Sequence, residues 1–296
     1  MRLFDPVGGD SLAGPAEGTD STEAAPSGPL RRVVLLVAYD GTAFHGMAAQ
    51  PGQRTVEGDI AGVLARMAGH PVRIVCAGRT DTGVHASGQV LHVDLDAVFV
   101  EGALRRTGDL APLATSLTRQ IGPACAVLAA DLAPEGFDAR HAAVSRRYRY
   151  RLLPGPSPDP LRRSLVWHTG RRLDLPPMRL AADALLGEHD FSGFCRRPEG
   201  HEGPLNRRVL DASLAPYCDE LHFFIEANAF CHRMVRSVVG ALVSVGEGRL
   251  TAADVVGILR TADRGRASRT APPGGLCLLE VRYPDELVPG GVLRAA

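Results

Sequence analysis

The sequence contains no lysine: all 33 of its basic residues, among 296 in total, are arginines. Chemistry that depends on a lysine amine, such as Schiff-base formation, pyridoxal phosphate binding or a P-loop, is therefore excluded. Long apolar runs are also missing, since no stretch of about eighteen residues lacks a charge, and we expect no membrane span. The N-terminus has no basic stretch followed by an apolar block, so we expect no secretory signal.

Cysteine motifs typical of metal sites are absent as well. The six cysteines are scattered, without a C-x-x-C pair or a matching histidine spacing, and this pattern argues against zinc. Most of them lie in apolar stretches and are interpreted as small buried residues. Together with the missing signal, they predict a protein of the reducing cytoplasm.

Charge is balanced overall, with 33 acidic residues against the 33 arginines, but it is distributed unevenly. Residues 1–30 hold one arginine and five acids, lack apolar periodicity, and are predicted to form a disordered acidic tail. Between residues 140 and 172, nine arginines face a single acid, Asp159. This cluster suits a polyanion such as nucleic acid. From composition alone, a solvated surface is an equally good interpretation of the cluster, because this protein uses arginine at every basic position.

Apolar patterning in the first half alternates between strand and helix periods. An unbroken apolar run predicts a strand over 33–39, and alternation predicts strands over 72–77 and 89–96. Between the first two of these strands, Thr55 is a suitable N-cap and Gly69 a suitable stop for a helix over 56–67.

The second half repeats this kind of pattern. Strands are predicted over 147–152, 165–169, 207–214, 221–227 and 276–283. Helices are predicted over 176–186, over 232–245, and after a capping box formed by Thr251 and Asp254. We therefore expect an α+β fold of two similar lobes, 31–139 and 140–288, with a mixed, mostly antiparallel sheet flanked by helices. An active-site cleft is expected between the lobes.

The first candidate site is the loop over 78–85, which joins two buried strands yet contains Arg79, Asp81 and His85 between glycines. Loops of this kind carry function more often than packing. Taken alone, Asp81 fits a structural turn residue at least as well. A metal pair of Asp81 with His85 is disfavoured, because Gly83 interrupts the helix that would align them.

The loop GRTDTGVH closely resembles the signature of the tRNA pseudouridine synthase A family, and further blocks resemble that family in the same order from about residue 31 to 285. These blocks are AYDG (38–41), TVE (55–57), F-x-AR (137–140), RRYRY (146–150), GEHDF (187–191), NAF-x-H-x-MVR (228–236) and APP-x-GL (271–276). The resemblance implies isomerisation of uridine to pseudouridine at positions 38 to 40 of the tRNA anticodon arm. It also implies a homodimer and no cofactor.

Carried over by motif, the resemblance makes Asp81 the group beside the sugar. Attack on the sugar, attack on uracil C6 and removal of a ribose proton all remain open for it. Arg236 is implied to pair with Asp81, and Leu276 to form the floor of the pocket. Tyr148 is implied to be a catalytic residue that stacks on the extruded base and whose hydroxyl can move a proton. Substrate-binding arginines are implied as well. They are Arg79, Arg146, Arg147 and Arg149.

The sequence departs from the family pattern at several positions. Met47 replaces the usual tryptophan of the segment after the first strand, and the usual block between the lobes is degenerate over 115–126. Thr82 replaces an alanine beside Asp81, and Arg233 replaces a histidine or asparagine. These changes surround the implied chemical groups without removing them, which favours an active enzyme.

Two other functions are kept as alternatives. A tRNA-binding or remodelling protein of the same fold would use the arginine surface with weak or no catalysis, and its binding would depend on salt. An acid-base enzyme acting on a small metabolite would rest on Asp81 and His85 alone. Indifference of activity to tRNA would identify this last class.

Overall fold

The computed structural model describes residues 28–293 apart from 198–199, 201–202, 268 and 289. Residues 1–27 of the predicted acidic tail lie outside the described part. One ten-stranded sheet extends through the molecule in the order β4-β1-β3-β10-β5-β9-β8-β7, with β2 beside β3 and β6 beside β5. The strands are β1 (Leu30–Tyr39), β2 (Ile74–Cys76), β3 (His85–Asp96), β4 (Cys125–Leu132), β5 (Ser145–Leu153), β6 (Trp167–His168), β7 (Gly187–Asp190), β8 (Asn206–Tyr217), β9 (Glu220–Ala227) and β10 (Leu276–Arg282).

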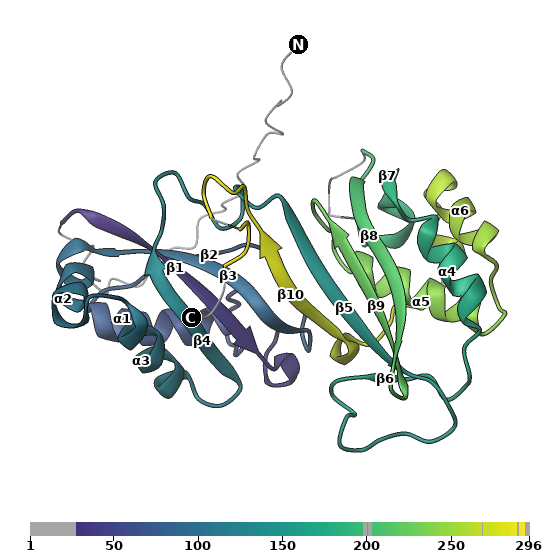
Figure 1. The fold of residues 1–296 in the computed structure, drawn as a ribbon, viewed down its shortest axis with the longest axis horizontal. Helices are drawn as coiled ribbons and strands as arrows, with labels where there is room; N and C mark the ends of the chain where they lie inside the picture. Colours follow the sequence, from purple (N-terminus) through teal and green to yellow (C-terminus); the bar gives the residue numbers. More distant parts are fainter. Residues whose placement is uncertain (1–27, 198–199, 201–202, 268, 289, 294–296) are drawn as a thin grey trace, which may run out of the picture.

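The three helices of the first half lie near the β4–β1 end of the sheet (Figure 1). They are α1 (Val56–Ala68), α2 (Ala97–Thr107) and α3 (Ala111–Ile121). The hydroxyl of Thr55 accepts the amide of Gly58 at 3.1 Å, and Gly69 ends α1 in the left-handed region at φ +79°. Both local signals for α1 are therefore confirmed.

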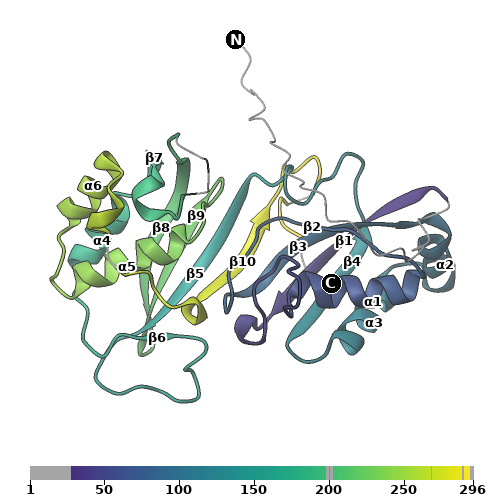
Figure 2. The same cartoon turned by 180° about the vertical axis from the view of Figure 1, so that it is seen from behind.

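The helices of the second half lie near the β8–β7 end, as the view from behind also shows (Figure 2). They are α4 (Leu175–Asp183), α5 (Met234–Gly246) and α6 (Ala252–Thr261). The capping box of Thr251 and Asp254 is present at the start of α6. Nearly every residue of α5 is buried, because this helix lies between the sheet and its neighbouring helices. This buried position makes α5 a rigid support for any side chain at its start.

Strand β10 joins the two halves. It pairs in parallel with β3 and antiparallel with β5, so the last strand of the chain lies in the middle of the sheet (Figure 1). The β5–β6 pair is also parallel, and the other pairings are antiparallel. The predicted mixed, mostly antiparallel sheet with flanking helices is confirmed. The division into lobes at residue 139 stays a prediction.

Several elements differ from the sequence expectation. Two helices, α2 and α3, and two strands, β4 and β7, were not predicted, and the degenerate segment 115–126 forms the end of α3 and the start of β4. The helix expected from residue 232 begins at Met234, because Arg233 before it has a left-handed backbone at φ +63°. The turn between β8 and β9 contains only residues 218 and 219, so both strands are longer than expected.

Candidate active site

Asp81 lies in the loop between β2 and β3, and buried hydrogen bonds hold this loop from the sheet side. The hydroxyls of Tyr39 and Thr80 are 2.8 Å apart. The side-chain amide of Gln89, which is fully buried, donates to the carbonyl of Gly78 at 2.7 Å. Since Thr80 is the immediate neighbour of Asp81, these bonds fix the backbone from which the carboxylate projects.

Arg236, on the first turn of α5, forms an ion pair with Asp81. Its Nη1 donates to Asp81 Oδ2 at 2.8 Å, and its Nε donates to the carbonyl of Ala271 at 2.8 Å. The side chains are 13% and 24% exposed, respectively. The two contacts hold the guanidinium against the carboxylate and fix the position of both groups. The predicted partnership of Arg236 and Asp81 is therefore present in the geometry.

A histidine that sequence reasoning did not single out stands on the other side of the carboxylate. His232 Nε2 is 3.6 Å from Asp81 Oδ1. Burial lowers the pKa of His232, and the nearby arginines Arg233 and Arg196 add to this effect against the opposing charge of Asp81. The imidazole is therefore neutral at neutral pH. His232 belongs to a motif block quoted above, which was the available signal for it.

The carboxylate of Asp81 faces a cavity of about 920 Å³ between the two halves of the molecule. Its walls come from segments 45–50 and 76–84 on one side and from β5, residues 229–236 and the start of β10 on the other. Asp81 is the acidic residue in a lining that is otherwise rich in positive charge. The lining arginines are Arg79, Arg140, Arg146, Arg207, Arg233 and Arg236. A cavity of this volume and charge suits an anionic ligand of nucleotide size.

Tyr148 and Leu276 supply apolar surface beside the carboxylate. Tyr148 is 7% exposed and Leu276 is 6% exposed, and both line the cavity. Burial raises the pKa of Tyr148, against the opposing effect of the Arg146 cation, so its hydroxyl stays protonated at physiological pH. The ring of Phe230 packs edge-on against Tyr148, with centroids 5.1 Å apart. These surfaces can hold a planar base.

Arg146 lines the cavity, but backbone carbonyls already accept from its guanidinium. It donates to Ala77 and Arg140 through Nη2 at 2.8 Å each, and to Ala143 and Asn228 through Nη1 at 3.0 and 2.9 Å. The side chain thus braces three segments of the cavity wall against one another. Its contact with substrate stays a prediction.

The structure does not bring Arg147 and Arg149 to the cavity. Side chains alternate along β5, so these two arginines lie on the face opposite Tyr148. Arg147 stacks over the ring of Phe224 at 5.4 Å and lies 3.6 Å from Asp211. Any contact of Arg147 or Arg149 with substrate would therefore be made on the face of the sheet opposite the cavity, and this contact stays a prediction.

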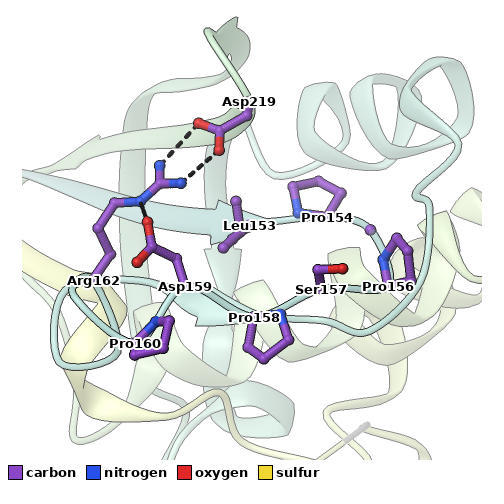
Figure 3. Close-up of a pocket in the computed structure, with 10 residues that line it drawn as sticks. Leu153, Pro154, Pro156, Ser157, Pro158, Asp159, Pro160, Arg162 and Asp219 are labelled. Carbon is purple, nitrogen blue, oxygen red and sulfur yellow. Dashed lines mark hydrogen bonds and ion pairs between the residues drawn. The ribbon is translucent and has the colours of Figure 1, made fainter.

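Part of the positive charge counted over 140–172 is neutralised in space. Arg151 forms hydrogen bonds of 2.6 and 2.7 Å with Glu220. Arg162 is bound by Asp159 and Asp219 at the edge of a hollow of about 440 Å³ beside the proline-rich turn (Figure 3). It also donates to Glu220 at 2.8 Å. This hollow therefore offers no unpaired guanidinium from Arg162.

His85 is a structural residue in this arrangement. It is 7% exposed, its Nδ1 accepts the amide of Gly41 at 3.1 Å, and its Nε2 lies 2.8 Å from the carbonyl of Ser164. Both ring nitrogens are thus engaged, and the ring links the first half to the second. His85 is not among the residues that line the cavity.

The single residues that depart from the family motif lie around the cavity. Met47 is fully buried, lines the cavity, and donates its amide to the carbonyl of Thr80 at 3.1 Å. It therefore packs beneath the Asp81 loop in the place expected for tryptophan. Thr82 and Arg233 are exposed at the rim of the same cavity.

The structure contains a disulfide that the sequence did not predict. Cys195 and Cys231 are joined by a disulfide, with Cα atoms 5.9 Å apart. The other four, Cys76, Cys125, Cys218 and Cys277, are free thiols, and Cys218 is exposed. The interpretation of most cysteines as small buried residues is correct only for Cys195 and Cys125, because Cys76, Cys231 and Cys277 are partly exposed and Cys218 is exposed. The pairing was not predicted because it depends on the tertiary fold.

Comparison with known proteins places this geometry in a family. A family model described as tRNA pseudouridine synthase matches residues 181–284. The tRNA pseudouridine synthase A of Frankia casuarinae is 46% identical and covers 87% of this chain and 91% of its own length. The proteins of the same name from Methylobacterium nodulans and Halalkalibacterium halodurans are 42% and 40% identical, over 86% and 83% of this chain and 96% and 90% of their own lengths.

A crystal structure of a Cbf5-Nop10-Gar1 complex aligns with a TM-score of 0.32 and 12% identity, over 89% of this chain and 62% of that chain. That likeness is too weak to bear on function. The sequence relatives, by contrast, define the chain as one of the tRNA pseudouridine synthases. More specifically, it belongs to the tRNA pseudouridine synthase A family, and the resemblance found in its motifs is confirmed. None of the described helices is both long and apolar enough to cross a membrane.

Proposed function

We propose that this chain isomerises uridine to pseudouridine at positions 38 to 40 in the anticodon stem-loop of tRNA. The observation that carries the proposal is the Asp81–Arg236 ion pair on the wall of an arginine-lined cavity of about 920 Å³. The reaction breaks the bond from uracil N1 to ribose C1′ and forms a new bond from uracil C5. It therefore needs a reactive group beside the sugar and an enclosed space in which the detached base turns.

Asp81 is the catalytic residue in this proposal. Its carboxylate attacks C1′, attacks uracil C6, or removes a ribose proton, and each of these roles requires the ionised form. Arg236 acts through Asp81 by holding the carboxylate in place, and is thus a positioning residue. Tyr148 and Leu276 hold the base between an aromatic ring and an aliphatic floor. The Tyr148 hydroxyl, which stays protonated, donates a proton to the reacting base.

Phosphate contacts offset the cost of extruding the target nucleotide, which is about a few kcal/mol. The arginines at the cavity, Arg79, Arg140, Arg207 and Arg233, are the nearest to a bound nucleotide. They recognise the backbone of the arm by shape and charge. Arg147 and Arg149 would contact substrate only where RNA reaches the opposite face of the sheet.

The working form that we propose is a cytoplasmic homodimer that needs no cofactor. The two-lobe division at residue 139 is part of the same proposal, with the Asp81 loop in the first lobe and Arg236 in the second. The arrangement of two subunits on one tRNA is what the family resemblance implies.

The test is release of tritium from tRNA transcripts that carry 5-tritiated uridine, because forming the bond at C5 expels that hydrogen. Wild type should release tritium, Asp81→Asn should release none, and Asp183→Asn, a matched change at an exposed position of α4, should behave as wild type. Release by Asp81→Asn at the wild-type rate would refute the catalytic role. Tight, salt-sensitive binding of tRNA without release by wild type would favour the tRNA-remodelling alternative.

A further inference from the structure

Two cysteines that are distant in the sequence meet beside the cavity. Cys195 follows the short 3-10 helix η2 (Phe191–Phe194), and Cys231 lies in the segment between β9 and α5, 36 residues later. Their Cα separation of 5.9 Å lies within the range that a disulfide requires. Isomerisation of uridine exchanges no electrons with the protein, so the proposed reaction does not use this bond.

The segment that Cys231 anchors forms the cavity wall next to Asp81. The neighbour of Cys231 on one side is Phe230, which packs against the tyrosine of the cavity, and on the other side His232, which is 3.6 Å from Asp81. Besides the disulfide, a backbone hydrogen bond of 3.0 Å from Arg196 to His232 ties this segment to the region after η2. The disulfide is therefore a covalent constraint on the position of two site residues.

The two cysteines differ in their exposure. Cys195 is 1% exposed, whereas Cys231 is partly exposed and lines the cavity. A thiol that enters the cavity thus meets Cys231 first, and Cys195 is the leaving group. After reduction the sulfurs no longer stay at a bonded distance of about 2 Å and separate to a contact of about 3.5 Å or more. Because Cys195 is enclosed, most of this movement falls on the segment of Cys231.

We propose that Cys195 and Cys231 form a thiol–disulfide switch that sets the shape of the cavity wall beside Asp81. In oxidation, the Cys231 thiolate attacks a small-molecule disulfide such as oxidised glutathione and releases one thiol. The Cys195 thiolate then attacks the mixed disulfide and releases the second thiol. The two cysteines thereby lose two electrons and two protons, and the small disulfide becomes two thiols. Reduction follows the same steps in reverse.

The effect of the switch on catalysis rests on the proposed function. The disulfide form holds Phe230 and His232 in the arrangement described above, so it is the faster form. Displacing a positioned group by about 1 Å costs up to about a hundredfold in rate. Since the displaced residues support the site and Asp81 itself is held by other bonds, we expect reduction to slow isomerisation about tenfold.

Three measurements on the full chain test the switch. Purified protein is held at defined ratios of reduced to oxidised glutathione, quenched with acid, alkylated and mapped by peptide mass spectrometry. The same samples are compared for deuterium uptake over residues 228–236 and for tritium release from tRNA. Cys195→Ser removes the pair, and Cys218→Ser, a change at an exposed free thiol, is the matched control.

We expect a Cys195–Cys231 cross-link in oxidising buffer, faster deuterium uptake over 228–236 after reduction, and about tenfold slower tritium release. Cys195→Ser should be insensitive to the glutathione ratio, while Cys218→Ser should keep the wild-type response. Full alkylation of both cysteines in oxidising buffer, or equal deuterium uptake in the two states, overturns the switch. A cross-link without tritium release in either state refutes the proposed function instead, and deuterium uptake still decides the switch.

Discussion

Replacing Arg236 by lysine keeps the positive charge of the site but removes the forked geometry. The guanidinium reaches two acceptors at once, Asp81 Oδ2 and the carbonyl of Ala271, each at 2.8 Å. A lysine amine on a shorter side chain cannot bridge both. At an effective dielectric constant of about 20, moving the charge from about 4 to about 6 Å from the carboxylate weakens the attraction by roughly 1.5 kcal/mol. Losing one hydrogen bond from a charged donor adds about 1.5 kcal/mol.

The sum, about 3 kcal/mol, corresponds to a rate decrease of up to about a hundredfold when all of it is lost from the transition state. The effect should appear in kcat, while the affinity for tRNA, which depends on many phosphate contacts, stays within about threefold. Single-turnover tritium release with enzyme in excess separates the two, and filter binding measures the affinity. Arg260→Lys, at an exposed position of α6, is the matched control.

Two results would refute this reasoning. If Arg236→Lys isomerises within about threefold of wild type, the fork to Ala271 is dispensable and charge alone suffices. If kcat is unchanged and tRNA affinity falls instead, Arg236 binds phosphate directly and the ion pair is not its working contact. Circular dichroism and a thermal melt of the variant exclude a folding defect as the cause.

Three further changes test the site and the contacts that stabilise the fold. Tyr148→Phe should lower the single-turnover rate about a hundredfold and leave tRNA binding within about threefold, because the raised pKa keeps its hydroxyl protonated as a donor. Gly41→Ala should lower the free energy of unfolding, measured in urea, by at least about 2 kcal/mol, since its Cβ would lie 2.0 Å from the carbonyl of Val84. Burial alone would raise the pKa of Glu220, but hydrogen bonds led by that from Arg151 lower it to about 2 from the ordinary 4.5. The lowered pKa of Glu220 contributes to the free energy of unfolding above pH 4.5, and this contribution is lost as the pH falls toward 2. Glu220→Gln should therefore lower the free energy of unfolding by about 3 kcal/mol at pH 7 and make it depend less on pH in the acid range.

Local signals predicted the elements whose ends are fixed by their own residues. Thr55 and Gly69 mark α1, and the Thr251 and Asp254 box marks α6, because caps act within one turn of the chain. Helix α2 begins directly after β3, with no loop between Asp96 and Ala97, so no break in the sequence pattern separates this helix from the strand. The place of β10 between β3 and β5 depends on pairings over more than 100 residues, and no local pattern specifies such a pairing.

The candidate site was predictable only in part for the same reason. Asp81 and Arg236 are 155 positions apart, and their pairing was implied by resemblance alone. The role of Arg162 could not be inferred from its neighbours in sequence, because two of its carboxylate partners, Asp219 and Glu220, belong to a distant hairpin. A count of charge along the chain therefore overstated the free positive charge in this region.

The central position of β10 makes the site depend on the whole sheet. Pro273, just before β10, packs on Gly83 of the Asp81 loop: a Cβ at Gly83, whose φ is +77°, would lie 3.0 Å from the proline ring. The carbonyl of Ala271, two residues earlier, accepts from Arg236. The same short segment thus supports the loop of the carboxylate and the guanidinium that pairs with it. Because this segment is positioned by β10 between β3 and β5, the ion pair forms only when strands from both halves are in register.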